Sequence, residues 1–445
     1  MITAIFSFLF LLNPAFAEIQ LFELKGSEAL TQAVASSQRL RSMQLDLEAS
    51  EKQSNSAHSS LFPKLSLEGY YRYQTNVQTI NLPIPNSIPI QFGDHNNYSV
   101  GPTLSYTLLD GGRLGQIYQG QLKLKESKEQ DQKATRLDLE SAVLGTYVHT
   151  QLNLEQIKTV AASLELSESQ GREVSSRFKA GSSSELDLLT ARQDVLNYKL
   201  KYKQTQSELA ASLRDLISLT GNTLIRDPSR PTPRGNPNST VWLELDSLDD
   251  SIKAQEKDPI AEPDQNQPKI QGQSFKADAL ELAAGAQRAA AYPTLVLTAQ
   301  ATYGYPNGPL LQNVNQNSFS ANFSMPIWEF GRTQLLAAQK QAEAESARAA
   351  KDQFMIDILR DFRKAKDLIS SLREQEQITL SSVETAQRSA QLYYQSYKAG
   401  HLNLIDVQAA NNRALQTKFN LAQIRAAILS QLISMHAIAG KDFLE

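Results

Sequence analysis

Two acidic residues at matching places in the sequence are the first candidates for chemistry. Asp187 lies in the stretch KAGSSSELDLL and Asp406 lies in KAGHLNLIDVQ, each six residues after a glycine, Gly181 or Gly400. A carboxylate near a helix end can satisfy free backbone N–H groups and favour the helix dipole. When several copies surround an opening, it can also attract cations. The sequence is compatible with both roles.

The residues around the aspartates favour a capping role for part of this pattern. Ser184 and Asn403 occupy matching positions three residues before the two aspartates. Ser and Asn are preferred at the N-cap of a helix, and glycine suits the left-handed conformation that follows a helix end. We therefore expect two helix–turn–helix connections, each with a glycine in the turn and an acidic residue in the first turn of the second helix.

Other arrangements of reactive side chains are missing from the sequence. The chain has no cysteine, which excludes thiol catalysis, disulfide bonds and cysteine-bound zinc. No two histidines have metal-ligand spacing, and no nucleophile–base pair or glycine-rich phosphate loop is found. Glu343 and Glu345 would point to different faces of a helix. We therefore predict no enzymatic activity, no cofactor and no metal site; the histidines are at positions 58, 95, 149, 401 and 436.

Charge and the N-terminal residues indicate where the chain acts. The 445 residues carry 44 Lys and Arg against 47 Asp and Glu, and the net charge of −3 gives no basic surface for nucleic acid. The first residues, MITAIFSFLFLLNPAFA, hold an apolar run, a proline and the pattern Ala15-Phe16-Ala17. We interpret residues 1–17 as a secretory signal peptide. The alternative, a transmembrane helix, needs about 20 apolar residues, and this run is shorter.

An internal repeat organises the chain. RFKAGSSSELDLL (177–189) matches SYKAGHLNLIDVQ (396–408) at an offset of 219 residues, and the same offset relates DGGR (110–113) to EFGR (329–332). Between the repeats lies an irregular connector that holds seven of the 17 prolines. We expect three parts after the signal peptide: a first repeat at 18–221, the connector at 222–274, and a second repeat at 275–445.

Each repeat contains two segments in which apolar and polar residues alternate, which is typical of a strand with two different faces. We expect a helical stretch before each pair, at 27–60 and at about 275–291. The apolar positions are Leu65, Leu67, Gly69, Tyr71 and Tyr73; Val100, Leu104, Tyr106 and Leu108; Leu295, Leu297, Ala299, Ala301 and Tyr303; and Phe319, Ala321, Phe323, Met325 and Ile327. Ser, Thr, Asn and Gln fill most of the opposite positions.

A very long helix is predicted after each strand pair, from about 113 to 178 and from about 332 to 397. Neither stretch contains a proline, and at 1.5 Å per residue each helix would be about 100 Å long. A second helix returns from the glycine turn to Gly221 or Gly440. Apolar residues recur mostly at intervals of three, four or seven, as in a coiled-coil seam, and the positions between them are polar.

Strands of about ten residues with one apolar and one small-polar face are typical of membrane β-barrels, with lipid outside and water inside. Four strands cannot close a barrel, which needs about eight. Two alternatives follow. The strands form part of a soluble sheet on a periplasmic coiled-coil scaffold, or several chains share one barrel whose wall the helices continue. Alternation in all four strands favours the second, because a soluble sheet exposes such a face only where another layer covers it.

The order of these elements resembles the TolC family of outer-membrane efflux proteins. The resemblance rests on the Pro-x-Leu-x-Leu strand openings at Pro63 and Pro293, the strand exits LLDGGR and IWEFGR, and the two turn motifs, and it covers essentially the whole chain after residue 17. It implies a mainly α-helical homotrimer in which four β-strands per chain contribute to a 12-stranded membrane barrel, continued by a helical coiled-coil barrel in the periplasm.

The resemblance also implies a function and partners. Members of the family lie in the outer membrane of Gram-negative bacteria and give passive export for tripartite efflux pumps or type I secretion systems. The helical tunnel contacts a periplasmic adaptor, and through it an inner-membrane transporter. For this chain it places Gly181, Ser182, Gly400 and His401 at the adaptor contact. The Pro-rich loop at about 77–96 would lie outside the cell, either as a variable loop or as a partial cap on the pore.

For the closed tip, the resemblance implies polar links between neighbouring helix pairs. The family's acid in the first turn corresponds to Asp187, and the tyrosine that it bonds corresponds to Tyr397. An arginine that completes the link corresponds to Leu402, so that part is missing here. Ala409 stands where some members carry a second acid, one helical turn beyond Asp406. We expect Asp187, Tyr397 and Asp406 to form the gate, with a weaker acidic ring.

Overall fold

The computed structural model describes residues 21–80, 83, 90–221, 242–257 and 259–443. The predicted signal peptide and part of the predicted connector, residues 222–241, lie outside the described residues. The chain divides into two compact units. The first contains Ala134–Asp264 and Asp357–Glu445 together with the residues up to Arg41, and the second contains Ser42–Lys133 and Gln265–Ile356.

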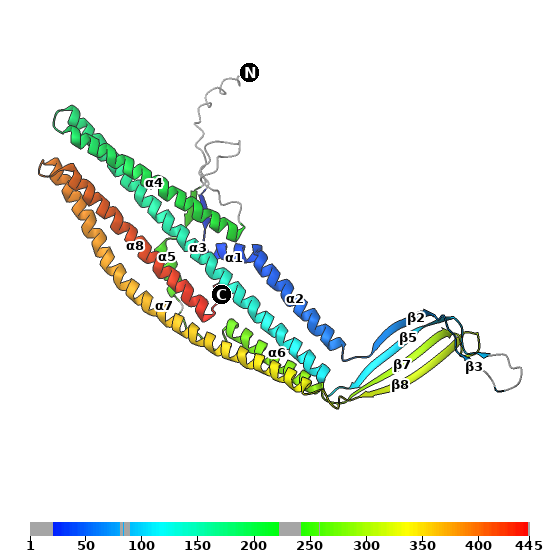
Figure 1. Cartoon of the computed structure of the whole chain (residues 1–445). Helices are drawn as coiled ribbons and strands as arrows, with labels where there is room; N and C mark the ends of the chain where they lie inside the picture. Colours follow the sequence, from blue (N-terminus) through cyan, green and yellow to red (C-terminus); the bar gives the residue numbers. More distant parts are fainter. Residues whose placement is uncertain (1–20, 81–82, 84–89, 222–241, 258, 444–445) are drawn as a thin grey trace, which may run out of the picture. The chain divides into compact units, whose positions relative to one another are not determined.

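The four predicted strands form one antiparallel sheet in the second unit (Figure 1). The strands are β2 (Lys64–Tyr73), β5 (Asn96–Leu109), β7 (Thr294–Tyr305) and β8 (Val314–Ser324), and the order across the sheet is β2-β5-β7-β8. The strand pairs of the two repeats therefore join through β5 and β7. Within one chain, β2 and β8 are the edges of this sheet. Two short strands, β3 (Thr79–Ile80) and β4 (Ile90–Gln91), pair in the loop between β2 and β5.

The end of β8 differs from the sequence prediction. The strand stops at Ser324, so Met325 and Ile327 lie beyond it although their alternation continued the pattern. Pro326 accounts for the difference, because proline has no N–H to donate to a neighbouring strand. The side chains that follow are nevertheless apolar and highly exposed: Ile327 is 91% and Phe330 is 88% exposed.

A glycine is required where the middle of β5 lies against β7. A Cβ on Gly101 would lie 1.9 Å from the carbonyl oxygen of Ala301 and 2.7 Å from Cα of Thr302. Both contacts are to backbone atoms of the neighbouring strand, which cannot rotate away. The next residue, Pro102, donates no hydrogen bond. The middle of β5 therefore depends on a residue without a side chain to keep its pairing with β7.

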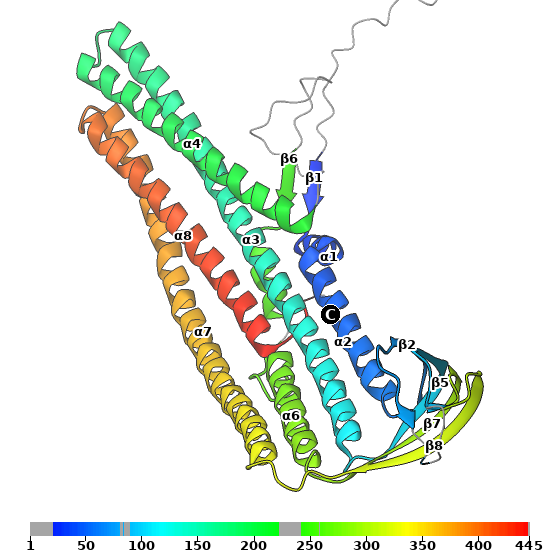
Figure 2. The same cartoon turned by 45° about the vertical axis from the view of Figure 1, so that its right-hand side comes forward.

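Four long helices follow the strands at the predicted offset. Helix α3 (Arg113–Lys179) and helix α7 (Arg332–Lys398) each have 67 residues, and α4 (Glu185–Thr220) and α8 (Leu404–Ala439) each have 36. Every boundary in the second set is 219 residues after its counterpart, as in Arg113 and Arg332. Helix α4 runs back along α3, and α8 runs back along α7 (Figures 1 and 2).

The helices before the strands begin and end differently from the prediction. Two helices, α1 (Gly26–Ser36) and α2 (Gln38–Ser59), replace the single stretch expected at 27–60. Ser37 separates them: its backbone is extended, and its hydroxyl accepts the N–H of Leu40 at 3.2 Å. Helix α6 (Pro268–Ala289) begins earlier than expected, because the Gln267 side chain caps it and proline suits its first position.

The first unit has one large apolar core. It joins α1, α3, α4, α5 (Leu248–Glu256) and α8, with Leu216, Ile428 and Val143 almost completely buried. Within the described residues, α8 is the one helix long and apolar enough to cross a membrane by composition. Part of its hydropathy is explained by packing inside the protein, because Ile428, Leu429 and Leu432 lie in this core.

The connector contacts both helical hairpins, which are α3 with α4 and α7 with α8. A short parallel pair, β1 (Leu21–Leu24) with β6 (Trp242–Leu245), precedes α5. At the turn into α5, the Asp246 carboxylate accepts the backbone N–H of Gly26 at 3.2 Å and the Tyr147 hydroxyl at 3.1 Å. The Gln151 side chain of α3 donates to the Asp246 carbonyl at 2.6 Å. These contacts fix the connector against α1 and α3, and all three donors are uncharged.

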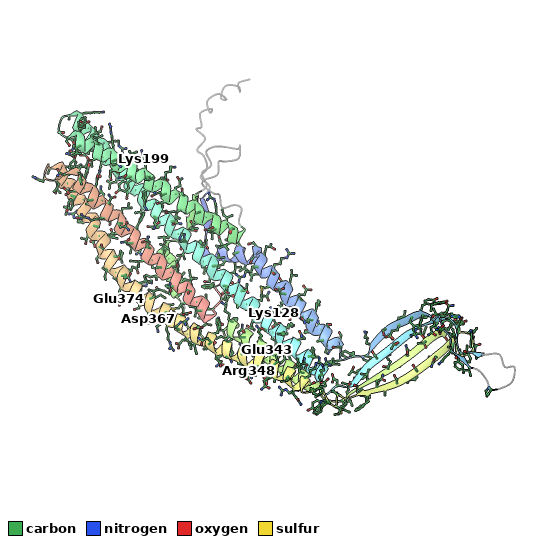
Figure 3. The ribbon with its side chains drawn as sticks, viewed as in Figure 1. Lys128, Lys199, Glu343, Arg348, Asp367 and Glu374 are labelled. Atoms are coloured by element: carbon green, nitrogen blue, oxygen red, sulfur yellow. The ribbon has the colours of Figure 1, made fainter. Side chains whose placement is uncertain are left out.

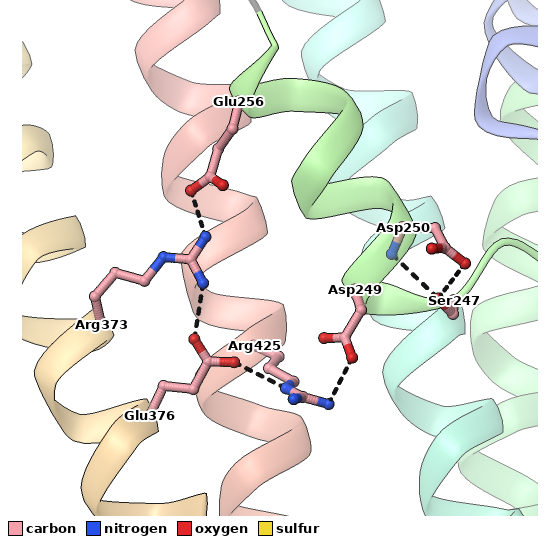
Figure 4. A network of polar contacts seen from close by, with 7 residues as sticks. All are labelled: Ser247, Asp249, Asp250, Glu256, Arg373, Glu376 and Arg425. Carbon is pink, nitrogen blue, oxygen red and sulfur yellow. Dashed lines mark hydrogen bonds and ion pairs between the residues drawn. The ribbon is translucent and has the colours of Figure 1, made fainter.

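On its other side, α5 is held by a chain of five charged residues (Figure 4). Asp249 at the start of α5 pairs with Arg425 of α8 at 3.0 Å, and Glu256 at the end pairs with Arg373 of α7. Glu376 of α7 joins the two arginines, at 2.7 Å to Arg373 and 2.9 Å to Arg425. Burial raises the pKa of Glu376, but the two guanidinium groups outweigh it and lower that pKa overall.

Most other charges lie on the outer surfaces of the helices (Figure 3). Lys199 of α4 pairs with Glu168 at 3.1 Å, and Arg348 of α7 pairs with Glu281 of α6. Glu343 binds Lys340 one helical turn earlier at 2.7 Å. Such exposed pairs contribute about 0–1 kcal/mol each. Their main effect is to keep these helix faces wetted.

Replacing Glu376 tests whether its charge holds α5 in place. In Glu376→Gln two arginines remain close together without their carboxylate, and we expect a loss of on the order of 2 kcal/mol. This is less than the about 3–5 kcal/mol for breaking a fully buried pair, because the arginines reach water. The measurement is thermal unfolding of the detergent-purified protein by circular dichroism. Glu374→Gln, on the exposed side of the same helix, is the matched control, and equal unfolding of both variants would contradict the assignment.

Candidate functional site

The two glycine turns lie at the ends of neighbouring hairpins in the first unit (Figures 1 and 2). Gly181 has φ of 74° and Gly400 has φ of 78°, both in the left-handed region. The N–H of Ser182 donates to the Arg177 carbonyl at 2.9 Å, and the N–H of His401 donates to the Ser396 carbonyl at 3.0 Å. Both turns are therefore Schellman motifs, in which glycine is favoured by its backbone conformation.

The first turn contains a complete capping box. The N–H of Asp187 donates to the Ser184 hydroxyl at 3.0 Å, and the Ser184 N–H donates to the Asp187 carboxylate at 3.4 Å. The Ser183 hydroxyl donates to the same carboxylate oxygen at 3.0 Å. Asp187 therefore stabilises the N-terminus of α4.

The second turn is capped differently, which corrects the expectation of a side-chain cap at Asn403. Asn403 is the N-cap of α8, but its side chain makes no capping hydrogen bond. The main-chain carbonyl of Asn403 instead accepts the N–H of Asp406 at 3.2 Å. That contact uses the N–H that a side-chain cap would have bound. Within the described residues, the half-buried Asp406 carboxylate makes no hydrogen bond or ion pair and is free to interact with solute or a neighbouring chain.

Tyr397 lies in a small apolar cluster beneath the turns. It is 8% exposed, and all four long helices contribute to the cluster, through Val174, Ala191, Tyr397, Leu404 and Val407. The Arg177 guanidinium stacks over the Tyr397 ring at 5.9 Å. Within one copy of the described chain, Tyr397 and Asp187 do not hydrogen bond. A link between copies stays a prediction.

The structure instead places Glu173 at the contact between the hairpins. Its carboxylate accepts the Tyr394 hydroxyl and pairs with Lys398 at 3.2 Å, both from α7. It also pairs with Arg177, one turn along α3, at 3.1 Å. The Tyr394 hydrogen bond, followed by Lys398 and Arg177, lowers the pKa of Glu173. Burial and the Glu173 charge raise the pKa of Tyr394. The carboxylate therefore stays ionised and the phenol stays protonated at neutral pH.

Sequence analysis missed Glu173, although a signal was present. Glu173 and Arg177 form an i,i+4 pair before the first turn glycine, and Tyr394 and Lys398 have the same spacing before the second. Each pair occupies one face of its helix. The sequence alone does not show that the face of α3 with Glu173 lies against the face of α7 with Tyr394.

Farther from the turns, the seam between the hairpins is polar. Asn411 donates to Gln170 at 3.1 Å, the Tyr198 hydroxyl donates to Asn412 at 3.1 Å, and Gln408 donates to the Thr190 carbonyl at 2.8 Å. A cavity of about 210 Å³ lies here among the four helices. Hydrogen bonds between uncharged groups contribute about 1 kcal/mol each and need defined geometry. The seam is thus specific without being strongly apolar.

The sheet of the second unit presents a different kind of surface. Its apolar face is open to the outside, with Leu67 75% exposed on β2 and Phe319 86% exposed on β8. The larger exposed side chains of this face are Leu65, Leu67, Tyr71, Tyr73, Val100, Leu104, Leu108, Leu297, Tyr303, Phe319 and Phe323. A continuous apolar face of this kind indicates contact with lipid or another protein. No group of three or more potential metal ligands occurs in the part of the chain that the structure describes.

Comparison with known sequences decides the family. A profile of the outer membrane efflux proteins matches residues 29–222 and 260–441, which together include both strand pairs and all four long helices. The chain belongs to the outer membrane efflux protein family. The unmatched residues 223–259 fall in the predicted connector. The resemblance inferred from the motif order is thereby confirmed.

Two curated members of the family give the range of similarity. The chain is 26% identical to the probable efflux pump outer membrane protein TtgC of Pseudomonas putida over 295 residues, 66% of this chain. That alignment spans 57% of the length of TtgC. It is 22% identical to the cation efflux system protein CusC of Escherichia coli over 407 residues, 89% of this chain and 82% of CusC.

Solved structures of the family show the same fold. A crystal structure of CusC superposes with a TM-score of 0.77 at 20% identity and covers 97% of this chain and 96% of that chain. The outer membrane protein VceC of Vibrio cholerae superposes with a TM-score of 0.74 at 15% identity, covering 94% of this chain and 97% of VceC. The fold of this efflux-family chain is thus that of the known outer-membrane channels.

Glu173→Gln tests the contact between the hairpins. The variant loses the charge that Tyr394, Lys398 and Arg177 share, and hydrogen bonds to charged groups contribute about 1.5–3 kcal/mol. We expect amide hydrogen exchange near both turns to become about tenfold faster. Glu168→Gln, which breaks the exposed pair with Lys199, is the control. Because the pKa of Glu173 is lowered, its contribution is present above the ordinary carboxyl range and is lost as pH falls through the lowered pKa. Equal exchange in both variants at pH 7 would contradict the assignment.

Proposed function

We propose that three copies of this chain form an outer-membrane channel continued by a periplasmic helical tunnel, which gives passive export for a tripartite efflux system. One observation carries the proposal. The sheet β2-β5-β7-β8 has an exposed apolar face and two unpaired edge strands, and both of its strand pairs lead directly into 67-residue helices. Such a sheet cannot be stable in lipid as a single copy.

The number of copies follows from the edges. In a membrane every backbone N–H and C=O must be satisfied within the protein, so the strands must close into a barrel. If β8 of each copy pairs with β2 of the next, three copies give a 12-stranded barrel, within the range of known outer-membrane barrels. The alternative, a soluble periplasmic scaffold, would leave Leu67 and Phe319 in water.

The periplasmic partners are proposed from the turns and from the names of the relatives. TtgC and CusC are described as parts of efflux systems. Gly181, Ser182, Gly400 and His401 are exposed at the turns, where a periplasmic adaptor would bind and connect the channel to an inner-membrane transporter. We also propose the division into repeats at 18–221 and 275–445, with the connector at 222–274 between them. No catalytic step is involved in this function.

A planar bilayer experiment tests the proposal. Detergent-purified protein should have the mass of a trimer and should give uniform stepwise conductance, because only a closed barrel provides a water-filled path. Asp187→Ala and Glu173→Gln are measured beside it to find which carboxylate holds the turn end of the tunnel closed. The variant that lacks that carboxylate should have a higher resting conductance. A monomer that salt releases from membranes without detergent, and that gives no conductance, would refute the channel.

The two turn aspartates give a separate prediction. If Asp187 and Asp406 form an acidic ring of six carboxylates in the trimer, replacing both with Asn should lower the preference for cations. The expected contribution of Asp406 is the larger one, since the Asp187 carboxylate is already bound by Ser183 and Ser184. The measurement is the reversal potential under a KCl gradient. A reversal potential identical to that of the wild type would exclude the ring.

A further inference from the structure

The charged residues of the sheet are few and lie on one strand. The strands β2, β5, β7 and β8 together contain three charged side chains: Lys64, Glu68 and Arg72, all on β2. They are four residues apart, so the period of two that a strand imposes places all three on the same face. All three are exposed.

That face is the polar one. Leu65, Leu67 and Tyr71 occupy the intervening positions of β2 and point to the opposite, apolar face. Opposite Lys64, the register continues through Ser105, Thr298 and Ser320 on the other three strands. An arginine on the lipid face near the membrane midplane would cost about 2–4 kcal/mol. In a barrel, the three charges therefore face the water-filled interior, among Ser, Thr, Asn and Gln side chains.

The surroundings keep the charges separate. Along the strand, neighbouring charges are about 14 Å apart, which is farther than the Debye length of about 8 Å at physiological ionic strength. Glu68 accepts the Ser66 hydroxyl at 3.1 Å and has Gly101 as its register partner. The Arg72 guanidinium stacks over the Tyr70 ring at 5.5 Å, on the same face and toward the loop end of the sheet. None of the three residues forms an ion pair in the described structure.

We propose that Arg72, with Glu68 and Lys64, sets the ion preference of the barrel. This inference rests on the proposed channel. Three copies place three arginines at one level near the loop end, three glutamates at mid-strand and three lysines at the helix end. Around the wall, equivalent charges are four strand spacings apart, about 19 Å. Arg72 at the loop end favours small anions, and the Tyr70 ring holds its guanidinium in place.

The direction of the effect distinguishes this ring from the carboxylates at the turns. Loss of Arg72 moves the channel toward cation preference, whereas loss of Asp187 and Asp406 moves it toward anions. A unit charge about 8 Å from a passing ion in water changes the local ion concentration about twofold. Screening by salt weakens this effect. The measurement therefore belongs at low ionic strength.

The experiment measures reversal potentials of the complete purified channel under a KCl gradient, with 0.1 M KCl or less on the dilute side. Arg72→Gln should raise the cation-to-anion permeability ratio about twofold, and Glu68→Gln should lower it by a similar factor. Arg72→Lys is the matched control, because it keeps the charge and should match the wild type. A smaller shift at 1 M KCl would support a direct electrostatic effect.

The outcomes separate this inference from the proposed function. If wild-type protein gives no conductance steps, the channel itself is refuted. If the channel conducts but Arg72→Gln and Glu68→Gln leave the reversal potential unchanged, the channel stands and the charged residues of β2 are excluded as its selectivity element. An equal shift in Arg72→Lys and Arg72→Gln would also overturn the proposal, since the side chain's shape would then matter instead of its charge.

Discussion

The structure depends on the backbone hydrogen bonding of a sheet that one chain cannot complete. Within a single copy, β2 and β8 have one unpaired edge each, and the sheet has an exposed apolar face. Soluble proteins usually protect such edges with charges, prolines or covering segments. Here the edge strands run regularly for ten and eleven residues, and β8 has no charged side chain, whereas β2 has three. In the proposed barrel, the need for paired edges in lipid accounts for the long edge strands, and the water-filled interior accounts for the polar face.

The helices meet a different requirement, because they must associate while much of their surface stays in water. The solution differs along their length. Near the connector an apolar core holds α3, α4, α5 and α8 together, with Leu216, Ile428 and Leu429 almost fully buried. Toward the turns the contacts become amide and hydroxyl pairs, such as Gln170 with Asn411. Since these pairs are individually weak, the turn end of the hairpins can rearrange more easily than the part that contains the core.

Much of the fold could be predicted because it is encoded in local patterns. Alternation of residue type located the strands, and the 219-residue offset located the four long helices. The turn glycines could be predicted to have positive φ, because this backbone conformation is set by the local turn. What could not be predicted depends on contacts between distant residues: the pairing of β1 with β6, the approach of β5 to β7 at Gly101, and the charge network around Glu376. The Ser37 break was local, but serine also occurs inside helices, so its sequence alone did not show it.

For the candidate site, the sequence located the turns but not the residues that join the hairpins. Asp187 and Asp406 occupy equivalent positions, yet the structure gives them different surroundings. Asp187 is bound within its own turn, whereas Asp406 has no side-chain partner in the described chain. Glu173 joins the hairpins because α3 and α7 bring its carboxylate next to Tyr394 and Lys398. Sequence symmetry therefore identifies equivalent positions, while tertiary contacts decide which of them carries the interaction.

An ionised glutamate holds contacts both at the connector and near the glycine turns. Glu376 and Glu173 have lowered pKa values because cations and hydrogen-bond donors surround their carboxylates. Their contribution to stability is present above the ordinary carboxyl range and is lost as pH falls through the lowered pKa. Burial gives Glu140 and Asp194 raised pKa values, so these two oppose folding as pH rises through the range where they ionise. The stabilising effect of Glu376 and Glu173 is thus lost in acid, whereas that of Glu140 and Asp194 is lost as the pH rises. The contact that joins the hairpins, at Glu173, is among those that acid weakens. Glu173 therefore keeps its charge in mild acid, and the contact between the hairpins weakens only as the pH falls below the ordinary carboxyl range. The apolar side chains of the core have no charge to lose.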